Sequence, residues 1–302
     1  MDLGSLIDRD ELLMAIGAWD ALTARMAEDA GAEAVYMSGS CVSSSVHGGP
    51  DVGLTTMSEM LDRARAIDAA IDVPLIADGD TGYGNPLNVR RTVREYERAG
   101  VNAIQLEDQD FPKKCGHFEG KRLISAPEFA TKVAAAVDAR ESDDFLIIAR
   151  TDAIAVDGLD EAIQRARLYR EAGADVSFIE APTEREQMQK VTEAVSGPHL
   201  ANLAAKGKTP PLSAEDLRDV GYDLAIYPSD AFKAALRTIQ DVYETLIEER
   251  SQESILEEMV EWEERDEITG LPEISTLEDR YERREREFER LYEEMASKTR
   301  AD

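Results

Sequence analysis

Short apolar runs alternate with amphipathic segments along most of the chain. The runs are rich in Ala, Val, Ile and Leu, which is typical of strands buried on both faces of a parallel sheet. They lie at 34–37, 73–77, 103–106, 145–149, 176–179, 199–203 and 224–227. Segments with helical spacing of apolar residues lie between them, at 57–70, 88–98, 127–139, 159–171 and 213–219. The pattern predicts alternating strands and helices around a parallel sheet.

A short repeat marks the ends of several predicted helices. Ala-Gly pairs stand at 30–31, 99–100 and 172–173, and Val220-Gly221 is placed similarly, each a few residues before a strand. Glycine just after a helix takes the left-handed conformation that ends it. With a first strand at 14–18, the chain has eight strand–helix units, the number that closes an α/β fold of the (β/α)8 TIM-barrel type. A doubly wound open sheet is the alternative, but no G-x-G-x-x-G follows the first strand.

The pattern changes near residue 238 to long, heavily charged helix. We therefore expect a barrel domain over 1–245 and a charged C-terminal helical extension over 246–302. Apolar residues recur at helical spacing near the end of the extension, at Leu277, Tyr281, Phe288, Leu291, Tyr292 and Met295. This stripe predicts packing either on the same barrel or on a neighbouring subunit, since Gly270 and Pro272 would let the helix swing out.

The charge balance limits the classes of partner. The chain has 34 Lys and Arg against 63 Asp and Glu, a formal net charge of −29. This excess excludes nucleic acid and anionic membranes as partners. Because the acidic residues are spread along the whole sequence, we expect a solvated surface suited to a high-salt cytoplasm, where counterions screen self-repulsion.

Cysteine content and the N-terminus indicate the compartment. Cys41 and Cys115 are the only cysteines, and they form no C-x-x-C motif, so neither a disulfide framework nor a structural zinc site is expected. The N-terminus has no basic, apolar leader, and no run approaches the ~18 apolar residues of a membrane span. We expect a soluble cytoplasmic protein.

Three carboxylates follow neighbouring predicted strands. Asp78 and Asp80 stand in D-G-D-T-G-Y-G after the third strand, and Glu107 ends the fourth. The carboxyl ends of barrel strands meet at one mouth, and an all-oxygen environment suits Mg²⁺, with Mn²⁺ as the alternative. The simpler interpretation is that the two aspartates only shape a turn or cap a helix. Glu107 on the next strand favours the metal site.

A second candidate segment, K-K-C-G-H, follows the fourth strand. Pro112 before it and Gly120 after it are typical of a mobile loop. Lys113 and His117 flank Cys115, and such neighbours favour the thiolate and offer a partner for proton transfer. An inert thiol is the alternative for a cysteine in a loop, but the flanking cations favour a functional one.

Together, D-G-D-T-G-Y-G, L-E-D-Q, K-K-C-G-H, A-R-T-D-A and F-I-E-A resemble the isocitrate lyase and phosphoenolpyruvate mutase superfamily, and most of all its 2-methylisocitrate lyases. The resemblance covers roughly residues 15–235. It implies a (β/α)8 barrel whose C-terminal helices are swapped between the subunits of a homotetramer.

The resemblance also implies roles for individual residues. Asp78 and Asp80 would hold the metal, directly or through water, with Glu107 in support. Cys115 would be the proton donor, with Lys113, His117, Arg150 and Glu180 as further catalytic residues. Arg150 would clamp a carboxylate bidentately. The residues that would bind substrate are Ser38, Gly39, Ser40, Asp51, Gly116, Arg150, Glu180, Asn202 and Arg265.

These roles define a reaction on a di- or tricarboxylate. The metal would chelate the hydroxyl and carboxylate of a 2-hydroxy acid, and the carbon–carbon bond would break toward a carbanion, which Cys115 protonates while the closed loop excludes water. Superfamily mutases and decarboxylases share the metal residues but lack the cysteine motif. A metal-dependent aldolase would not require the thiol, and an acidic scaffold would not require the carboxylates with Arg150.

The substrate depends on the shape of the pocket. Phe178 and Tyr227-Pro228 resemble 2-methylisocitrate lyases, which favours cleavage of 2-methylisocitrate to pyruvate and succinate. Ala204, Ser229 and Lys233 depart from that group, standing where threonine, leucine and arginine are expected. Isocitrate, giving glyoxylate and succinate, another substituted malate, and oxaloacetate decarboxylation therefore stay open, because one methylene is worth only ~1–3 kcal/mol in such a pocket.

Overall fold

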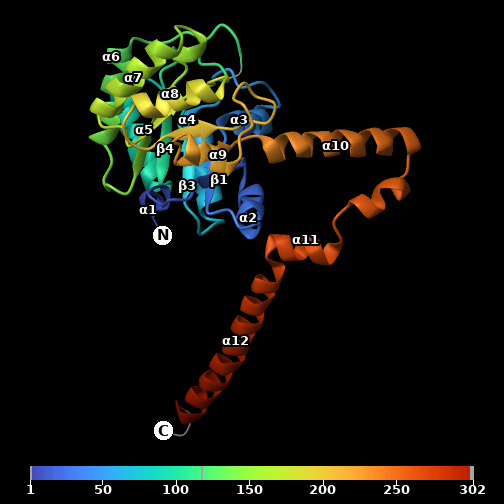
Figure 1. The fold of residues 1–302 in the computed structure, drawn as a ribbon. Helices are drawn as coiled ribbons and strands as arrows, with labels where there is room; N and C mark the ends of the chain where they lie inside the picture. The colour runs from blue at the N-terminus through green and yellow to red at the C-terminus, as the bar shows by residue number, and fades with distance from the viewer. Residues whose placement is uncertain (1, 117, 300–302) are drawn as a thin grey trace. The chain divides into compact units, whose positions relative to one another are not determined.

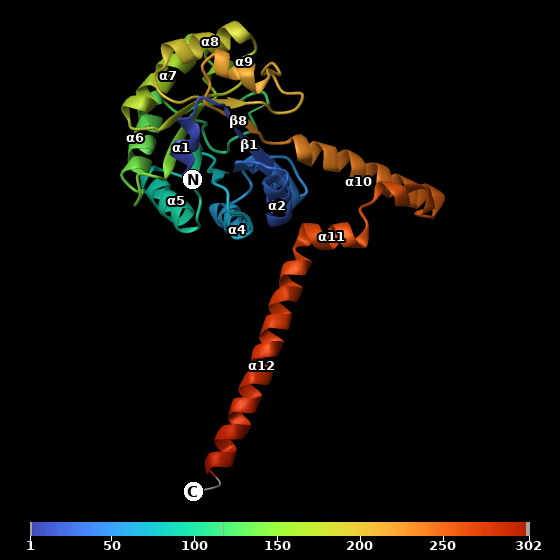
Figure 2. The same ribbon diagram turned by 60° about the horizontal axis from the view of Figure 1, so that its bottom comes forward.

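The computed structural model describes residues 2–116 and 118–299, and its core is a ring of parallel strands inside a ring of helices (Figures 1 and 2). The strands are β1 (Leu13–Ala18), β2 (Ala34–Met37), β3 (Leu75–Asp78), β4 (Ala103–Glu107), β5 (Leu146–Thr151), β6 (Val176–Ile179), β7 (Leu200–Asn202) and β8 (Leu224–Tyr227). The helices up to the last strand are α1 (Leu3–Ile7), α2 (Ala21–Asp29), α3 (Gly39–His47), α4 (Met57–Asp68), α5 (Pro86–Arg98), α6 (Ala126–Val137), α7 (Leu159–Glu171), α8 (Arg185–Ala194) and α9 (Ala214–Asp219), with a 3-10 turn at Ala153–Ala155.

The strand order is that of a barrel. Neighbours run β6-β5-β4-β3-β2-β1-β8-β7, all parallel, and a bridge between Ser177 and His199 joins β6 to β7. The eight-stranded (β/α)8 prediction is confirmed, and the open doubly wound sheet is excluded. Because the strands are parallel, the residues that follow them gather at one end of the barrel.

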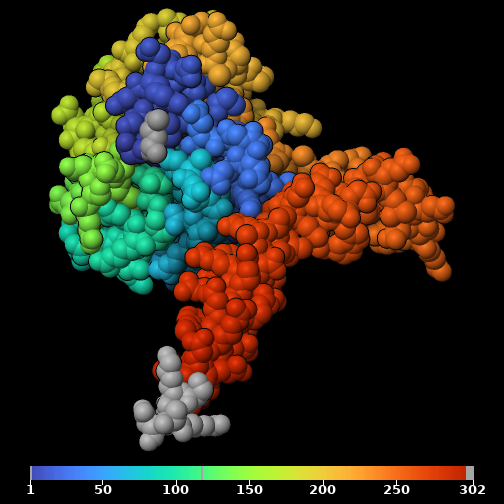
Figure 3. All heavy atoms as spheres, turned by 90° about the horizontal axis from the view of Figure 1, so that it is seen from below, coloured from blue at the N-terminus to red at the C-terminus, as the bar shows by residue number. Residues whose placement is uncertain are grey.

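Alternate strand residues fill the inside and the outside of the barrel. In β3, Ile76 points into the barrel, whereas Leu75 and Ala77 pack in the layer between strands and helices. The interior cluster also includes Leu3, Leu6 and Ile7 of α1, which closes the amino-terminal end of the barrel, as Figure 3 shows from below. Helix α1 was not predicted from the sequence.

The predicted Ala-Gly helix ends are confirmed. Gly31, Gly100, Gly173 and Gly221 follow α2, α5, α7 and α9 with φ between 90° and 102°. Residues other than glycine rarely adopt this backbone conformation. The glycines therefore end each helix and turn the chain toward the next strand.

Gly17 in β1 has a different role, because a Cβ there would lie 2.5 Å from the carbonyl oxygens of Tyr227 and Pro228. Gly17→Ala should therefore lower the free energy of unfolding by about 1–3 kcal/mol, because the added methyl group would push away the backbone at the end of β8. Chemical denaturation measures this, with Gly49→Ala as control, since a Cβ at Gly49 has no neighbour within 4 Å. Equal stability of the two variants would contradict the packing described.

The chain divides into two compact units, Met1–Thr238 and Ile239–Asp302. Helix α10 (Asp230–Glu249) runs across this division, and the predicted boundary at residue 245 also falls within it. The second unit continues with a 3-10 turn (Glu253–Glu258), α11 (Trp262–Thr269) and α12 (Leu271–Thr299). Gly270 ends α11 with a φ of 78°. Packing of the apolar stripe of α12, either on the same barrel or on a neighbouring subunit, stays a prediction. In the described residues, no helix is both long and apolar enough to cross a membrane.

Candidate active site

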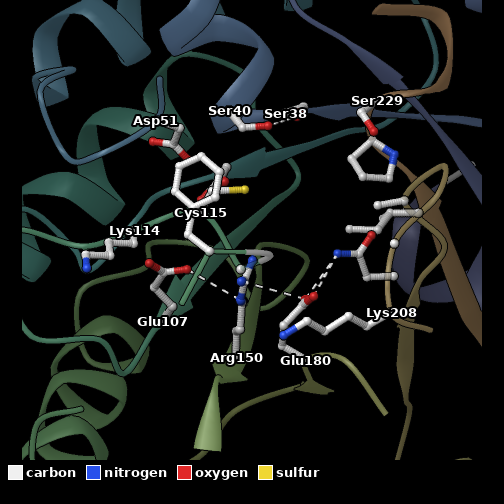
Figure 4. A pocket seen from close by; sticks show the side chains of 18 of the residues that line it. Ser38, Ser40, Asp51, Glu107, Lys114, Cys115, Arg150, Glu180, Lys208 and Ser229 are labelled. Atoms are coloured by element: carbon white, nitrogen blue, oxygen red, sulfur yellow. Dashed lines mark hydrogen bonds and ion pairs between the residues drawn. The ribbon is translucent and has the colours of Figure 1, made fainter. Parts of the chain in front are cut away.

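A cavity of about 490 Å³ opens at the carboxyl ends of the strands (Figure 4). Most of the predicted site residues line it, namely Ser38, Ser40, Asp51, Asp78, Glu107, Lys113, Cys115, Gly116, Arg150, Glu180 and Asn202. They lie at or after the carboxyl ends of six strands, β2 to β7, and the barrel brings them to one mouth. Gly39 and Asp80 lie directly beside lining residues, as described below.

One wall of the cavity is a cluster of buried carboxylates around Lys113. The Lys113 ammonium lies 2.7 Å from Asp51 Oδ1 and 2.6 Å from Asp80 Oδ1, and all three side chains are less than a tenth exposed. Asp78 Oδ1 accepts hydrogen bonds from the Asp80 backbone N–H at 3.0 Å and from Gln105 Nε2 at 3.3 Å. The D-G-D turn thus places both aspartates on the cavity side, and Lys113 ties Asp80 to the cysteine loop.

Burial dominates the electrostatics of this wall. It raises the pKa of Asp80 to about 6 and raises the pKa of Asp78 and Glu107, because each carboxylate loses hydration and faces like charges. Burial alone would lower the pKa of Lys113, but the surrounding carboxylates raise it well above its usual value. A further cation beside this wall would therefore favour the charged forms of these carboxyl groups.

The donor atoms of this wall fit a hard divalent cation. Glu107 Oε1 is buried and has no hydrogen-bond partner, and Asp80 Oδ1 has only its ion pair with Lys113. Across residues 2–116 and 118–299, no three His, Cys, Asp or Glu side chains form a ready-made metal cluster. Mg²⁺ often takes one or two carboxylates and several waters. Asp78 and Asp80, with Glu107 in support, are suitable for that coordination, and their roles stay a prediction.

Magnesium binding should depend on pH through Asp80. A carboxyl group must lose its proton to bind a cation. The pKa of Asp80 is raised to about 6, so at a pH below this value each Mg²⁺ must displace a proton from Asp80. The rise in melting temperature caused by millimolar Mg²⁺ should be large near pH 7.5 and should shrink as pH falls through about 6. Thermal unfolding with and without Mg²⁺ measures this. A rise that is larger at pH 5 would contradict the assignment.

A second wall is built on Arg150 and meets the first at Glu107. Its Nε and Nη2 donate to Asp152 at 3.0 and 3.1 Å, and the guanidinium lies 3.4 Å from Glu107 and 3.7 Å from Glu180. Asn202 Nδ2 donates to Glu180 Oε2 at 3.1 Å. Burial would lower the pKa of Arg150, but these carboxylates raise it well above its usual value. Arg150 is therefore a fixed cation that faces the cavity.

Phe178 lies beneath this wall rather than in it. The Arg150 guanidinium stands 5.1 Å from its ring centroid, and the ring belongs to the fully buried barrel interior. Phe178 is not among the residues that line the cavity, whereas Ala204, Ser229 and Lys233 are. Any influence of Phe178 on substrate choice must therefore be indirect, through neighbours that do line the cavity, such as Arg150.

A third side of the site is the start of α3. Ser38 precedes the helix, and its Oγ lies 3.5 Å from Ser40 Oγ. A Cβ at Gly39 would lie 2.5 Å from Asp78 Oδ2, so only glycine lets this backbone approach the carboxylate. Helix N-termini of this kind present N–H groups that favour an anion.

The cysteine loop lies over the cavity. Cys115 donates its backbone N–H to Asp51 O at 3.1 Å, and the Gln109 side chain pairs with both backbone groups of Lys114 at 3.0 and 2.8 Å. Figure 4 shows the Cys115 sulfur pointing into the pocket. His117 falls outside the described residues. Arg265 belongs to the second unit, where its guanidinium stacks on Trp262 at 4.0 Å, and its substrate role stays a prediction.

Several polar residues in or behind the lining were not predicted from the sequence, among them Tyr36, which lines the cavity. Tyr36 donates to Gln105 at 2.7 Å, and Gln105 in turn donates to Asp78. A glutamine inside an apolar run was the available signal. Asp152, in the A-R-T-D-A motif, is fully buried, yet Arg150 and Lys121 hold its pKa below the usual value against the effect of burial.

Comparisons with known proteins show the family of the chain. The family model for phosphoenolpyruvate phosphomutase matches residues 3–247. A 2,3-dimethylmalate lyase of Eubacterium barkeri is 45% identical, over 91% of this chain and 96% of that protein. A 2-methylisocitrate lyase of Aeropyrum pernix is 41% identical, over 98% of this chain and 93% of that protein.

Solved structures give the same result. A crystal structure of 2,3-dimethylmalate lyase, described as a PEP mutase/isocitrate lyase superfamily member, has a TM-score of 0.87 at 36% identity and covers 92% of this chain and 93% of that one. A phosphonopyruvate hydrolase complex with oxalate and Mg²⁺ has a TM-score of 0.84 at 32% identity, with coverage of 92% and 97%. The chain therefore belongs to the PEP mutase/isocitrate lyase superfamily, as its motifs predicted, and is one of its carbon–carbon lyases.

Proposed function

We propose that this enzyme cleaves 2-methylisocitrate to pyruvate and succinate with the help of Mg²⁺. The observation that carries the proposal is the meeting of three elements in one cavity: the buried carboxylates, the fixed Arg150 cation and the Cys115 loop. Each alone has a simpler explanation. Together they provide a cation site, a carboxylate clamp and a proton donor, which is what cleavage of a substituted 2-hydroxy acid requires.

Asp78 and Asp80 are the residues that would hold Mg²⁺, with Glu107 in support. When bound, the ion would polarise the hydroxyl and carboxylate of the substrate and stabilise the carbonyl product. A solved relative in complex with oxalate and Mg²⁺ supports Mg²⁺ as the ion. Mn²⁺, with similar ligand preferences, is the alternative ion.

The chain's own groups would carry out the proton transfers. The substrate hydroxyl passes its proton to solvent, and the O–H electron pair forms the new carbonyl bond. The electron pair of the broken carbon–carbon bond moves to the departing carbon, which takes the Cys115 S–H proton. The thiolate that remains then regains a proton from solvent. Arg150 would fix the carboxylate next to the departing carbon, and the Cys115 loop would exclude water that could otherwise protonate it.

The cations of the cavity favour a highly charged substrate. Five of the chain's nine lysines, Lys113, Lys114, Lys206, Lys208 and Lys233, line this cavity in a protein of net charge −29. Figure 4 shows Lys208 extending into the pocket. Lys113 is already paired with Asp51 and Asp80. Lys206, Lys208 and Lys233 therefore offer positive charge to a third carboxylate, which 2-methylisocitrate has and 2,3-dimethylmalate lacks.

A second candidate is a substituted malate. The 45% identity to a 2,3-dimethylmalate lyase favours it, as does an apolar part of the lining formed by Phe118, Ile226 and Pro228, which suits methyl groups. Isocitrate and oxaloacetate fit the same polar groups and stay as further alternatives.

A substrate panel distinguishes these candidates. Purified full-length protein in molar KCl with Mg²⁺ is offered 2-methylisocitrate, isocitrate, 2,3-dimethylmalate and oxaloacetate, and pyruvate, glyoxylate, oxalate and the released acid are measured. We expect the highest kcat/KM with 2-methylisocitrate. A higher value with 2,3-dimethylmalate would replace the proposed substrate, and no cleavage of any compound would overturn the proposal.

We further propose that the protein works in the cytoplasm as a homotetramer that exchanges its C-terminal helices. The apolar stripe of α12 and the break at Gly270, which ends α11, support exchange, whereas Pro272 lies within the first turn of α12. Light scattering of the full chain in molar KCl should give about four times the mass of 33.4 kDa. A monomer under these conditions would contradict this.

A further inference from the structure

Lys121 is a buried lysine for which the proposed chemistry has no use. Its side chain is 2% exposed, and its ammonium donates to two acceptors: the Gly116 carbonyl at 2.5 Å and Asp152 Oδ1 at 2.7 Å. Gly116 directly follows Cys115, so one end of this tether lies next to the proposed proton donor. The other end lies on a carboxylate that is fully buried.

Asp152 connects this tether to the substrate clamp. The same Oδ1 that accepts from Lys121 also accepts from Arg150 Nη2 at 3.1 Å, and Oδ2 accepts from Arg150 Nε at 3.0 Å. The carboxylate thus joins the cysteine loop to the guanidinium that faces the cavity. Charge-assisted hydrogen bonds in a buried setting are strong and directional, so they fix position as well as adding stability.

Gly116 also makes close contact with the clamp. A Cβ at this position would lie 2.4 Å from Arg150 Nη2 and 3.2 Å from Glu180 Oε1. The loop backbone therefore rests on the Arg150–Glu180 pair, and Cys115 faces the same pocket as these two residues (Figure 4). Displacement of the Gly116 carbonyl would move Cys115 away from a substrate held by Arg150.

The start of the loop has its own anchors. Cys115 N–H bonds to Asp51 O, and Lys113 pairs with Asp51 and Asp80. These contacts hold the loop to the carboxylate wall. The Lys121 tether holds it to Asp152, and through Asp152 to the Arg150 wall.

We propose that Lys121 is a positioning residue: by bonding the Gly116 carbonyl to Asp152, it holds the Cys115 loop closed over the site and aligns the thiol with a substrate clamped by Arg150. The inference rests on the proposed role of Cys115 as proton donor. It adds the residue that couples closure of the loop to the orientation of the clamp.

The test compares Lys121→Met with Lys121→Arg and with a surface control. Lys121→Met keeps the length of the side chain and removes its charge and donors. Lys190→Met is the control, because Lys190 also pairs with an aspartate at 2.6 Å, but both side chains are more than half exposed. Two quantities are measured in full-length protein: the alkylation rate of the Cys115 peptide by iodoacetamide, followed by mass spectrometry, and kcat and KM.

In Lys121→Met, the alkylation rate of Cys115 should rise about tenfold, because the loop opens more often. The kcat should fall about 100-fold, because the donor is misaligned, while KM should stay within about threefold, because Arg150 keeps both bonds to Asp152. Lys121→Arg should recover part of kcat and slow alkylation again. Lys190→Met should match the wild type in both measurements.

The proposal is overturned if Lys121→Met changes neither quantity by more than about twofold, or if kcat falls while alkylation does not change. Should Lys121→Met not fold, Lys121→Gln takes its place with the same criteria, because its neutral and shorter side chain cannot bridge the Gly116 carbonyl and Asp152. Alkylation needs no substrate. Faster alkylation in a chain that cleaves none of the offered acids would support the tether while overturning the proposed function.

Discussion

Cys115→Ser should lower kcat by about 10²–10⁴-fold with little change in KM. A hydroxyl is a far weaker acid than a thiol, so it cannot deliver a proton to the departing carbon at a useful rate. The groups that hold the substrate remain, since Arg150, Asn202 and the carboxylate wall do not involve the sulfur. Steady-state kinetics on the best substrate of the panel measures both constants.

Cys41→Ala is the matched control for this variant. Cys41 is the only other cysteine and is 2% exposed, and its sulfur donates to Pro228 O at 3.4 Å rather than lining the cavity. Its loss should reduce stability more than turnover. If Cys115→Ser retained kcat within about threefold of the wild type, Cys115 could not be the donor, and another group would have to supply the proton.

Asp80→Asn should abolish most of the response to Mg²⁺ and lower activity by about 100-fold or more, since loss of even an outer-shell partner costs about 10–100-fold. The substitution keeps the shape of the side chain and removes the charge that attracts the cation. Calorimetric titration with Mg²⁺ and the Mg²⁺ dependence of kcat measure the loss.

Asp51→Asn separates this effect from the loss of a partner for Lys113. Both aspartates lie within 2.7 Å of the Lys113 ammonium, but the D-G-D turn places Asp80 beside Asp78 and the strand end. If the metal assignment is right, Mg²⁺ affinity should fall further in Asp80→Asn than in Asp51→Asn. Equal losses in the two variants would show that the anchoring of Lys113, rather than a metal ligand, had been removed.

The fold was readable from the sequence because its strands are short apolar runs separated by helices that end in glycine. Parallel strands bring the residues that follow them to one mouth. The sequence alone therefore predicted one site for the four strand-end residues Asp78, Glu107, Arg150 and Glu180. The motifs added the cysteine loop. They also predicted the family, and the comparisons confirmed the family.

Other features depend on packing that a one-dimensional pattern does not contain. Helix α1 is too short for a periodic signal, yet Leu3, Leu6 and Ile7 close the barrel interior. Phe178 lies beneath Arg150 and not in the cavity, because alternation along β6 turns it into the barrel. From the sequence, Lys121 would be expected at the surface, because it lies in a charged loop. The fold instead buries it against Asp152.

The most direct test of the account is the reaction of the full chain with 2-methylisocitrate and Mg²⁺ in molar KCl prepared in D₂O, followed by proton NMR. Because Cys115 exchanges its proton with solvent and delivers it to one carbon, the products should be pyruvate and succinate in equal amounts, with one deuterium in each succinate. The Cys115→Ser variant should lose this reaction. No cleavage of 2-methylisocitrate or of any other acid in the panel would contradict the central claim that this cavity is the site of a carbon–carbon lyase.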